Sequence, residues 1–300
     1  MKRKTISNEE LAARRKEYAS WILSLPALAW LVAFFLIPYV IIFLYSFFET
    51  GVYEVDPVFT IGAYNEVLFD WNYLKSFYIS IRLALFTTIF CIILGYPAAY
   101  FIARSSEKMK NILLMLIIIP FWTNLVIRIF SWRIFLAPHG VLNTFLTDLN
   151  LIDNPLLLLR TDFAVLLVMV YVYLPYMILP LYATIEKIDF SLLNAAMDLG
   201  AKPFQAFLRV TLPLSKQGIL AGTILVFIPS LGAYVIPQLI GNQNSLFIGQ
   251  IITYKVKNIP RNWPVASALS FFLLMIIILL LIFFYYLNVR IKRRGFENAN

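Results

Sequence analysis

Apolar residues occur along this chain in six long runs, separated by polar and charged segments. A helix needs about 20 mostly apolar residues to cross the core of a bilayer, and all six runs are of that length. We therefore predict six membrane-spanning helices. Their approximate bounds are 21–48, 77–103, 111–136, 163–185, 219–240 and 265–287. Prolines interrupt several runs, which membrane helices tolerate because neighbouring groups satisfy the freed carbonyls.

Basic residues are distributed unevenly among the segments outside these runs. Four segments together hold 17 lysines and arginines, whereas three others hold 6. The basic group comprises 1–20, 104–110, 186–218 and 288–300, and the other group comprises 49–76, 133–162 and 241–264. Cytoplasmic loops carry the basic excess in membrane proteins, so we predict both termini in the cytoplasm. The first run lacks a small-residue cleavage site, and we expect it to be a retained span.

The composition supports membrane insertion and excludes several other classes. Hydrophobic residues make up 61% of the 300 residues and charged residues 14%, whereas soluble proteins have about 45–50% and about 25%. Cys91 and His139 are single in the chain, which excludes an internal disulfide and a Cys/His metal cluster. We find no phosphate-binding loop, paired carboxylates or nucleophile–base set, and we expect no catalytic centre, metal or cofactor. The net charge of +9 follows from topology, so we expect no nucleic-acid partner.

Acidic residues gather in the predicted extracytoplasmic loop 49–76. The loop holds five carboxylates against the single basic residue Lys75. The carboxylates are Glu49, Glu54, Asp56, Glu66 and Asp70. One interpretation is that the loop gathers cations outside the cell. The other is a solvated loop whose charge merely follows the distribution of basic residues.

The predicted cytoplasmic loop 186–218 has the pattern of two short helices. Good helix formers run up to Gly200, a residue suited to the left-handed position that closes a helix. Pro203 then stands where the first turn of a second helix tolerates proline. Apolar residues recur after it at intervals of three and four, and we expect Pro213 to end this second helix. Spacing alone leaves two interpretations open, a knob for another protein and an amphipathic hairpin lying on lipid.

A motif within this loop resembles that of a known family. Asn194-Ala195-Ala196 is followed after three residues by Gly200, and after nine more by Val210-Thr211-Leu212-Pro213. Permease subunits of binding-protein-dependent ABC importers have E-A-A, three residues, Gly, nine residues and I-x-L-P, so Asn194 departs from the usual glutamate. The resemblance implies that the loop docks into a cleft on an ATPase subunit and transmits its closure to the pore. The residues implied in this coupling are Asn194, Ala195, Ala196, Asp198, Gly200, Ala201 and Pro213.

Further segments resemble the spermidine/putrescine importer permeases. They are Gly95-Tyr96-Pro97, the run from Pro120 to Arg128, Leu174-Pro175-Tyr176-Met177, Pro180-Leu181-Tyr182 and Ile185-Glu186-Lys187. This resemblance implies an all-α membrane protein of the type I ABC importer permease fold, in the bacterial cytoplasmic membrane. The implied parts are a cytoplasmic segment 1–20, a first span 21–48, the loop 49–76, a permease domain 77–287 and a basic tail 288–300. The implied partners are an ATPase dimer, a second permease and an extracellular polyamine-binding protein.

Several residues are candidates for lining a path for such a polycation. Aromatic faces attract ammonium groups by roughly 0.5–2 kcal/mol each, so several weak contacts guide a polyamine without trapping it. Trp122, Thr123 and Asn124 follow Pro120, where a bend frees carbonyl groups, and Tyr176 and Tyr234 are further candidates. The alternative is that these aromatic residues pack between helices or belong to the interface belts.

Other residues within the spans are expected to be structural. Gly218 and Gly222 form a G-x-x-x-G pattern that predicts close helix approach. We expect Cys91 to be a small apolar filler and assign Arg82 and Arg128 a structural or gating role, because a cationic path opposes a cationic cargo. No Asp or Glu stands deep in a span, so recognition of the cargo is expected to rest with the binding protein.

Three rival functions remain as alternatives. The first keeps the ABC permease architecture and changes the cargo to another small organic solute. The second is a secondary transporter or channel working alone, a class that tends to show inverted repeats or intramembrane acids, and the sequence shows neither pattern. The third is a membrane-embedded enzyme, which the missing catalytic set disfavours.

Overall fold

The computed structural model of the chain describes residues 23–51, 55–242 and 246–297, and for residues 287–297 it describes the backbone alone. The fold is helical, apart from a short antiparallel pair of strands in which Glu49 lies opposite Asp56. The elements in chain order are the π-helix η1 (Val32–Leu36), α2 (Ile37–Tyr45), β1 (Glu49–Thr50), β2 (Val55–Asp56), α3 (Gly62–Phe69), α4 (Trp71–Arg104), α5 (Glu107–Ile118), the 3₁₀ helix η2 (Ile119–Trp122), α6 (Leu125–Phe135), α7 (Val141–Asp148), α8 (Asp162–Ile185), α9 (Ser191–Asp198), α10 (Pro203–Ala206), the π-helix η3 (Phe207–Thr211), α11 (Leu212–Leu214), α12 (Lys216–Leu231), α13 (Val235–Ile240), α14 (Ile248–Lys257) and α15 (Trp263–Glu297). The predicted segment 1–20 and Glu54 lie outside the described residues.

Four described helices are long and apolar enough to cross a membrane, and two bent pairs of helices bring the number to six if each pair is one span. The four are Leu23–Tyr45, α4, α8 and the stretch Trp263–Tyr286 of α15. Helix α4 begins at Trp71, within the predicted loop 49–76, and α15 continues through the predicted tail to Glu297. The prediction of a helical membrane protein is confirmed.

The third predicted span, 111–136, is not one straight helix. Its two halves meet at an angle of 94° between Trp122 and Leu125. Proline cannot donate a backbone hydrogen bond, and the helix tightens into the 3₁₀ turn η2 at Pro120. The Thr123 hydroxyl then donates to the Pro120 carbonyl at 2.7 Å, while the Asn124 side chain accepts from the N–H of Val126 at 2.8 Å and caps α6. Thr123 and Asn124 therefore build the bend.

The fifth predicted span, 219–240, also differs from a single helix. Helix α12 ends at Leu231, and residues 232–234 separate it from α13. At its other end, α12 is joined to the preceding short helices, which end at Leu214, through a bend of 65°. The sequence is apolar on both sides of Gly232, so a prediction based on the length of the apolar run could not find the break in the helix there.

The core is formed by α4, α8 and α12, which pack against one another. Their contact surface is lined by fully buried side chains, among them Cys91, Met177 and Leu181. A Cβ atom added at Gly222 would lie 2.5 Å from the Met177 sulfur, and one added at Gly218 would lie 2.7 Å from the Thr184 hydroxyl. The predicted close approach at these two glycines is thus confirmed, and Cys91 fills a buried position as predicted.

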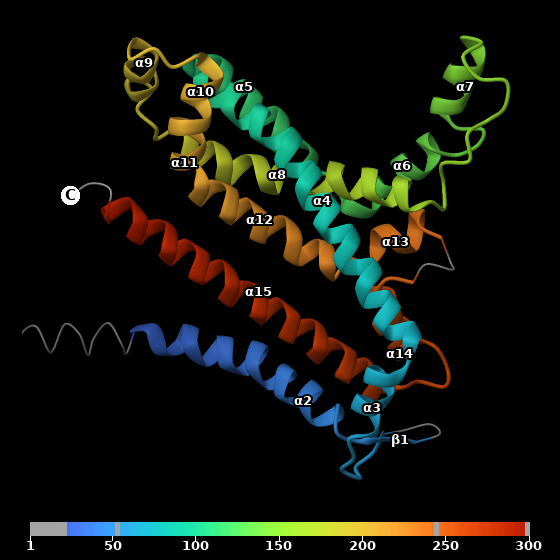
Figure 1. The fold of residues 1–300 in the computed structure, drawn as a ribbon. Helices are drawn as coiled ribbons and strands as arrows, with labels where there is room; N and C mark the ends of the chain where they lie inside the picture. Colours follow the sequence, from blue (N-terminus) through green and yellow to red (C-terminus); the bar gives the residue numbers. More distant parts are fainter. Residues whose placement is uncertain (1–22, 52–54, 243–245, 298–300) are drawn as a thin grey trace, which may run out of the picture.

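The helices run between two ends of the molecule (Figure 1). The short helices α9 to α11 lie at one end, on the side where α15 finishes, and we call this the hairpin end. The strands, α3, α7, α13 and α14 lie toward the other end, which we call the loop end. Helix α2 runs beside α15 along one edge of the bundle, and its membrane-spanning stretch has no buried residue.

Candidate functional site

The hairpin end carries two short helices joined by a tight turn, as the sequence predicts. Gly200 adopts a φ of 90°, in the left-handed region. Its N–H donates to the Met197 carbonyl at 2.9 Å, and the N–H of Ala201 donates to the Ala196 carbonyl at 3.1 Å. These two bonds form a Schellman motif, which satisfies the last carbonyls of α9. Pro203 then begins the second helix, and we call the segment 191–214 the coupling hairpin.

The second helix of the coupling hairpin does not end at Pro213 as predicted. It continues through the π-turn η3 and finishes at Leu214. In a π-helix each N–H bonds to the carbonyl five residues earlier instead of four. Pro213 comes just after this π-turn, and the helix continues through it for one more residue. Ser215 then ends the helix with φ −87° and ψ 0°.

An apolar surface of the coupling hairpin faces outward. Leu199 is 90% exposed and Phe204 70% exposed, and Leu192 and Leu208 are exposed as well. Asn194, Ala195 and Asp198 are exposed on α9 beside them, whereas Ala196 and Ala201 are half-buried. Large apolar side chains exposed on so short a segment point to an interaction surface. The geometry thus suits a partner that covers large apolar side chains and meets a few polar groups at their edge.

The inner side of the coupling hairpin is fastened to α4 by aromatic rings. Phe207 meets Tyr96 at 5.5 Å and Tyr100 at 5.8 Å between ring centroids, both edge to face. Phe190, just before α9, meets Tyr100 at 6.2 Å. The Tyr96 hydroxyl also shares a buried 2.8 Å hydrogen bond with Ser215. We call these five residues the aromatic anchor.

The aromatic anchor was missed as a functional feature of the sequence. Tyr96 belongs to a segment noted for its family resemblance, and Phe207 is one of the apolar residues that recur after Pro203. The spacing of apolar residues along one helix does not show that Tyr96 and Phe207, which are more than a hundred positions apart, are in contact. The signal that bears on it is Tyr100, which lies one helical turn after Tyr96 and so shares its face of α4.

A charged cluster ties α5 to the end of α8 beside the coupling hairpin. Lys110 donates to Glu186 at 2.8 Å and to Glu107 at 2.9 Å, with only 10% of its side chain exposed. The hydrogen bond from Lys110, together with one from Tyr182, holds the pKa of Glu186 below its usual value. The pKa of Asp189 is lowered as well, because the backbone N–H and the hydroxyl of Ser191 donate to its carboxylate. Both carboxylates are therefore ionised where α8 leads into the coupling hairpin.

The bend in the third span brings together part of the predicted substrate path. Trp122 is 82% exposed. Its neighbour Phe121 meets Tyr176 of α8 edge to face, with 5.2 Å between ring centroids, and Phe121 was not among the predicted residues. Tyr234 stands elsewhere, at the start of α13, with the Lys257 ammonium 5.9 Å from its ring centroid.

The two intramembrane arginines lie in different surroundings. Arg82 of α4 forms an ion pair with Asp162 at the start of α8, at 2.5 Å. Arg128 stacks over Phe121 at 5.7 Å, and its Nε atom is buried without a hydrogen-bond partner among the residues described. Arg82 thus has a structural partner.

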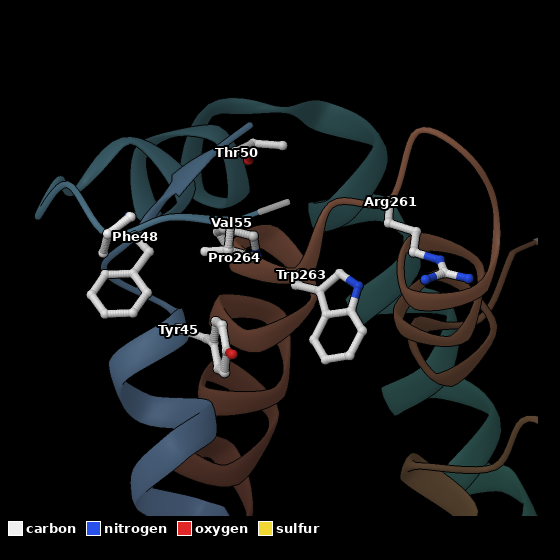
Figure 2. Close-up of a pocket in the computed structure, with 8 residues that line it drawn as sticks. Tyr45, Phe48, Thr50, Val55, Arg261, Trp263 and Pro264 are labelled. Atoms are coloured by element: carbon white, nitrogen blue, oxygen red, sulfur yellow. The ribbon is translucent and has the colours of Figure 1, made fainter. Parts of the chain in front are cut away.

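A further pocket of about 420 Å³ opens where α2 ends and α15 begins. Figure 2 shows Tyr45, Phe48 and Trp263 around it, with Thr50 and Val55 of the strands above. Tyrosine and tryptophan concentrate at membrane interfaces. The aromatic lining of this pocket is therefore typical of a membrane interface.

Sharply bent apolar helices around a packed core, with a short helical hairpin fastened at one end, define a transport permease of the type I ABC importer fold. A solved structure with this fold is a bacterial alginate ABC transporter in complex with alginate pentasaccharide-bound periplasmic protein, with a TM-score of 0.75 and 16% identity over 92% of this chain and 96% of that one.

The family model for binding-protein-dependent transport system inner membrane components matches residues 92–294. The chain belongs to this family. It is a multi-pass protein of the cytoplasmic membrane, works with a binding protein and an ATPase subunit, and acts in transport and not as an enzyme.

Two curated relatives are similar to this chain over most of its length. The spermidine/putrescine transport system permease protein PotB of Salmonella typhimurium (strain SL1344) is 43% identical over 242 residues, 80% of this chain and 84% of that one. The inner membrane ABC transporter permease protein YdcU of Escherichia coli (strain K12) is 34% identical over 237 residues, 74% of each chain.

Proposed function

We propose that this chain is one of two permease subunits in an ATP-driven importer of spermidine and putrescine. The observation that carries the cargo class is the 43% identity to a spermidine/putrescine permease over 80% of the chain. The second permease is a homologous chain that completes the translocation path. Both termini lie in the cytoplasm, because the segments rich in lysine and arginine then face inward.

The coupling hairpin docks onto the ATPase subunit. Leu199 and Phe204 enter a cleft on that subunit, and Asn194, Ala195 and Asp198 meet its edge. The aromatic anchor supports this role, because a docked hairpin that is fixed to α4 moves that helix when the ATPase closes. The Gly200 turn holds the two short helices at the angle that the cleft requires.

The bend at Thr123 and Asn124 borders the path of the cargo. Trp122 presents an exposed ring there, and the Phe121–Tyr176 pair closes the side toward α8. Each exposed ring attracts an ammonium group by about 0.5–2 kcal/mol, which guides a polycation without holding it. The ring of Tyr234 already faces Lys257, so its contribution to the path is smaller.

The test is uptake of labelled spermidine and putrescine by cells that lack every other polyamine importer, with and without this chain. Loss of uptake on deletion, restored by the wild-type chain, supports the proposal. Unchanged uptake with a normally assembled transporter discards the polyamine cargo and keeps the alternative, another small organic solute. Uptake that persists without any ATPase subunit contradicts the importer itself and favours a secondary transporter.

A further inference from the structure

A pocket of about 500 Å³ opens at the loop end, between α6, the segment before α8 and α13. Two arginines line it, Arg133 from the last turn of α6 and Arg160 from the residues that precede α8. Gln238 and Gly241 form the wall contributed by α13 and its end. The pocket is therefore a cationic recess built from three parts of the chain that are distant in sequence.

Neither arginine is neutralised within residues 23–51, 55–242 and 246–297. The ion pairs of lysine and arginine there belong to Arg82, Lys110 and Lys255. Arg133 and Arg160 are both exposed. Two unpaired guanidinium groups at the rim of one recess form a site of positive potential, which attracts anions and repels cations.

The backbone holds Arg160 in an uncommon conformation. Its φ is 64°, in the left-handed region, which is unfavourable for a residue with a side chain. The Arg160 N–H donates to the Ile240 carbonyl at 2.9 Å, and the next residue, Thr161, caps α8 through its hydroxyl at 3.1 Å. Glycine or asparagine would adopt this conformation at lower cost, so the arginine at this position points to a use for its side chain.

We propose that this recess, with Arg133 and Arg160, docks the extracytoplasmic binding protein by receiving carboxylates at the rim of its cargo cleft. The proposal rests on the proposed function, because a protein that captures a polycation needs an acidic cleft. Arginine suits this partner, since its planar group binds a carboxylate through two parallel hydrogen bonds. The arginines are not cargo ligands, because they repel a polyamine. Their engagement of rim carboxylates instead places the open cleft over the path.

The experiment uses the complete transporter in nanodiscs of zwitterionic phosphatidylcholine, with the binding protein loaded with spermidine. The affinity of the two is measured by surface plasmon resonance for the wild type and for the double variant Arg133→Glu/Arg160→Glu. We expect at least about tenfold weaker binding for the double variant, and a smaller difference in about 0.5 M salt, where charges on exposed groups are screened. Arg160→Lys keeps the charge but loses the second parallel hydrogen bond to a carboxylate, so we expect its affinity to lie between those of the wild type and the double variant.

Matched controls separate the recess from general charge and from lipid. Arg261→Glu reverses another exposed arginine at the loop end and is expected to keep wild-type affinity. Equal affinity of the double variant and the wild type would overturn the proposal, as would equal weakening by Arg261→Glu. A charge effect seen only in nanodiscs of anionic phosphatidylglycerol would assign the recess to lipid headgroups and overturn it too. If the wild-type transporter itself does not bind the spermidine-loaded protein, the proposed function is contradicted. That result differs from equal binding by the wild type and the double variant, which contradicts only the docking proposal. The melting temperature of each purified complex shows that the variants are folded.

Discussion

Replacing Phe207 with alanine tests how the coupling hairpin is joined to the membrane helices. The change removes two edge-to-face ring contacts with α4, to Tyr96 and Tyr100, besides a stacked contact with Phe204 at 6.4 Å within the hairpin. Each such contact contributes about 0.5–1.5 kcal/mol beyond burial, so the pair contributes about 1–3 kcal/mol. A coupling free energy of this size corresponds to a factor of about 5–150 in an equilibrium. We therefore expect Phe207→Ala to lower the cargo moved per ATP hydrolysed several-fold.

The assay is transport and ATP hydrolysis measured together in proteoliposomes containing the whole importer. Phe204→Ala is the matched control, because Phe204 is a phenylalanine of the same short segment but is 70% exposed. We expect Phe204→Ala to weaken assembly with the ATPase while leaving the transport per ATP of assembled complexes unchanged. Phe207→Ala should show the opposite pattern, with normal assembly and wasted hydrolysis.

Equal transport per ATP in the Phe207→Ala variant and the wild type would refute the idea that the aromatic anchor transmits movement. Loss of assembly in Phe207→Ala would contradict it differently, by showing that the ring shapes the docking surface. Phe207→Tyr retains a ring and is expected to behave like the wild type in both measurements.

Three further predictions concern single contacts. Gly200→Asp is expected to abolish transport while membrane insertion remains normal. Asparagine has the shape of aspartate without its charge and tolerates the left-handed turn, so Gly200→Asn should retain more transport. Full transport by a well-expressed Gly200→Asp variant would contradict the docking role. The pKa of Glu186 is lowered from its usual value of about 4.5, chiefly by Lys110, so their interaction stabilises the fold above pH 4.5 and is lost as the pH falls through the lowered pKa. The melting temperature of Glu186→Gln should therefore change less than that of the wild type between about pH 7 and pH 3. An equal pH dependence in both proteins counts against the pair. The side chains of Arg82 and Asp162 are both about 40% exposed, so Arg82→Gln and Asp162→Asn should each lower the free energy of unfolding by at most about 1 kcal/mol. The double variant should be no less stable than either single variant. A large loss of transport without loss of stability would instead reveal a gating role.

Local features of the coupling hairpin were predictable because they depend on neighbouring residues. A left-handed turn selects glycine at position 200, and the first turn of a helix tolerates Pro203. The close approach of α12 to α8 was likewise readable from Gly218 and Gly222. Each of these follows from the shape of one residue or one helical turn.

Bends and distant contacts were not predictable in the same way. Proline in an apolar run is compatible with a straight, kinked or broken helix, and the 94° bend depends on Thr123 and Asn124 together. Pro213 was wrongly expected to end its helix, because the π-turn that accommodates it has no simple sequence signal. The aromatic anchor needed knowledge of which helix faces meet.

The close packing at Met177 explains how movement of a small hairpin can reach a large part of the bundle. Gly95 and Gly222 lie so near Met177 that a Cβ atom at either would come within 3.0 Å of its side chain. Helices in such contact cannot slide past one another without a clash, so we expect α4, α8 and α12 to move as one body. The coupling hairpin joins this body twice, through the aromatic anchor on α4 and through the 65° bend into α12. On the docking proposed above, a displacement of the coupling hairpin by the ATPase is expected to shift all three helices together.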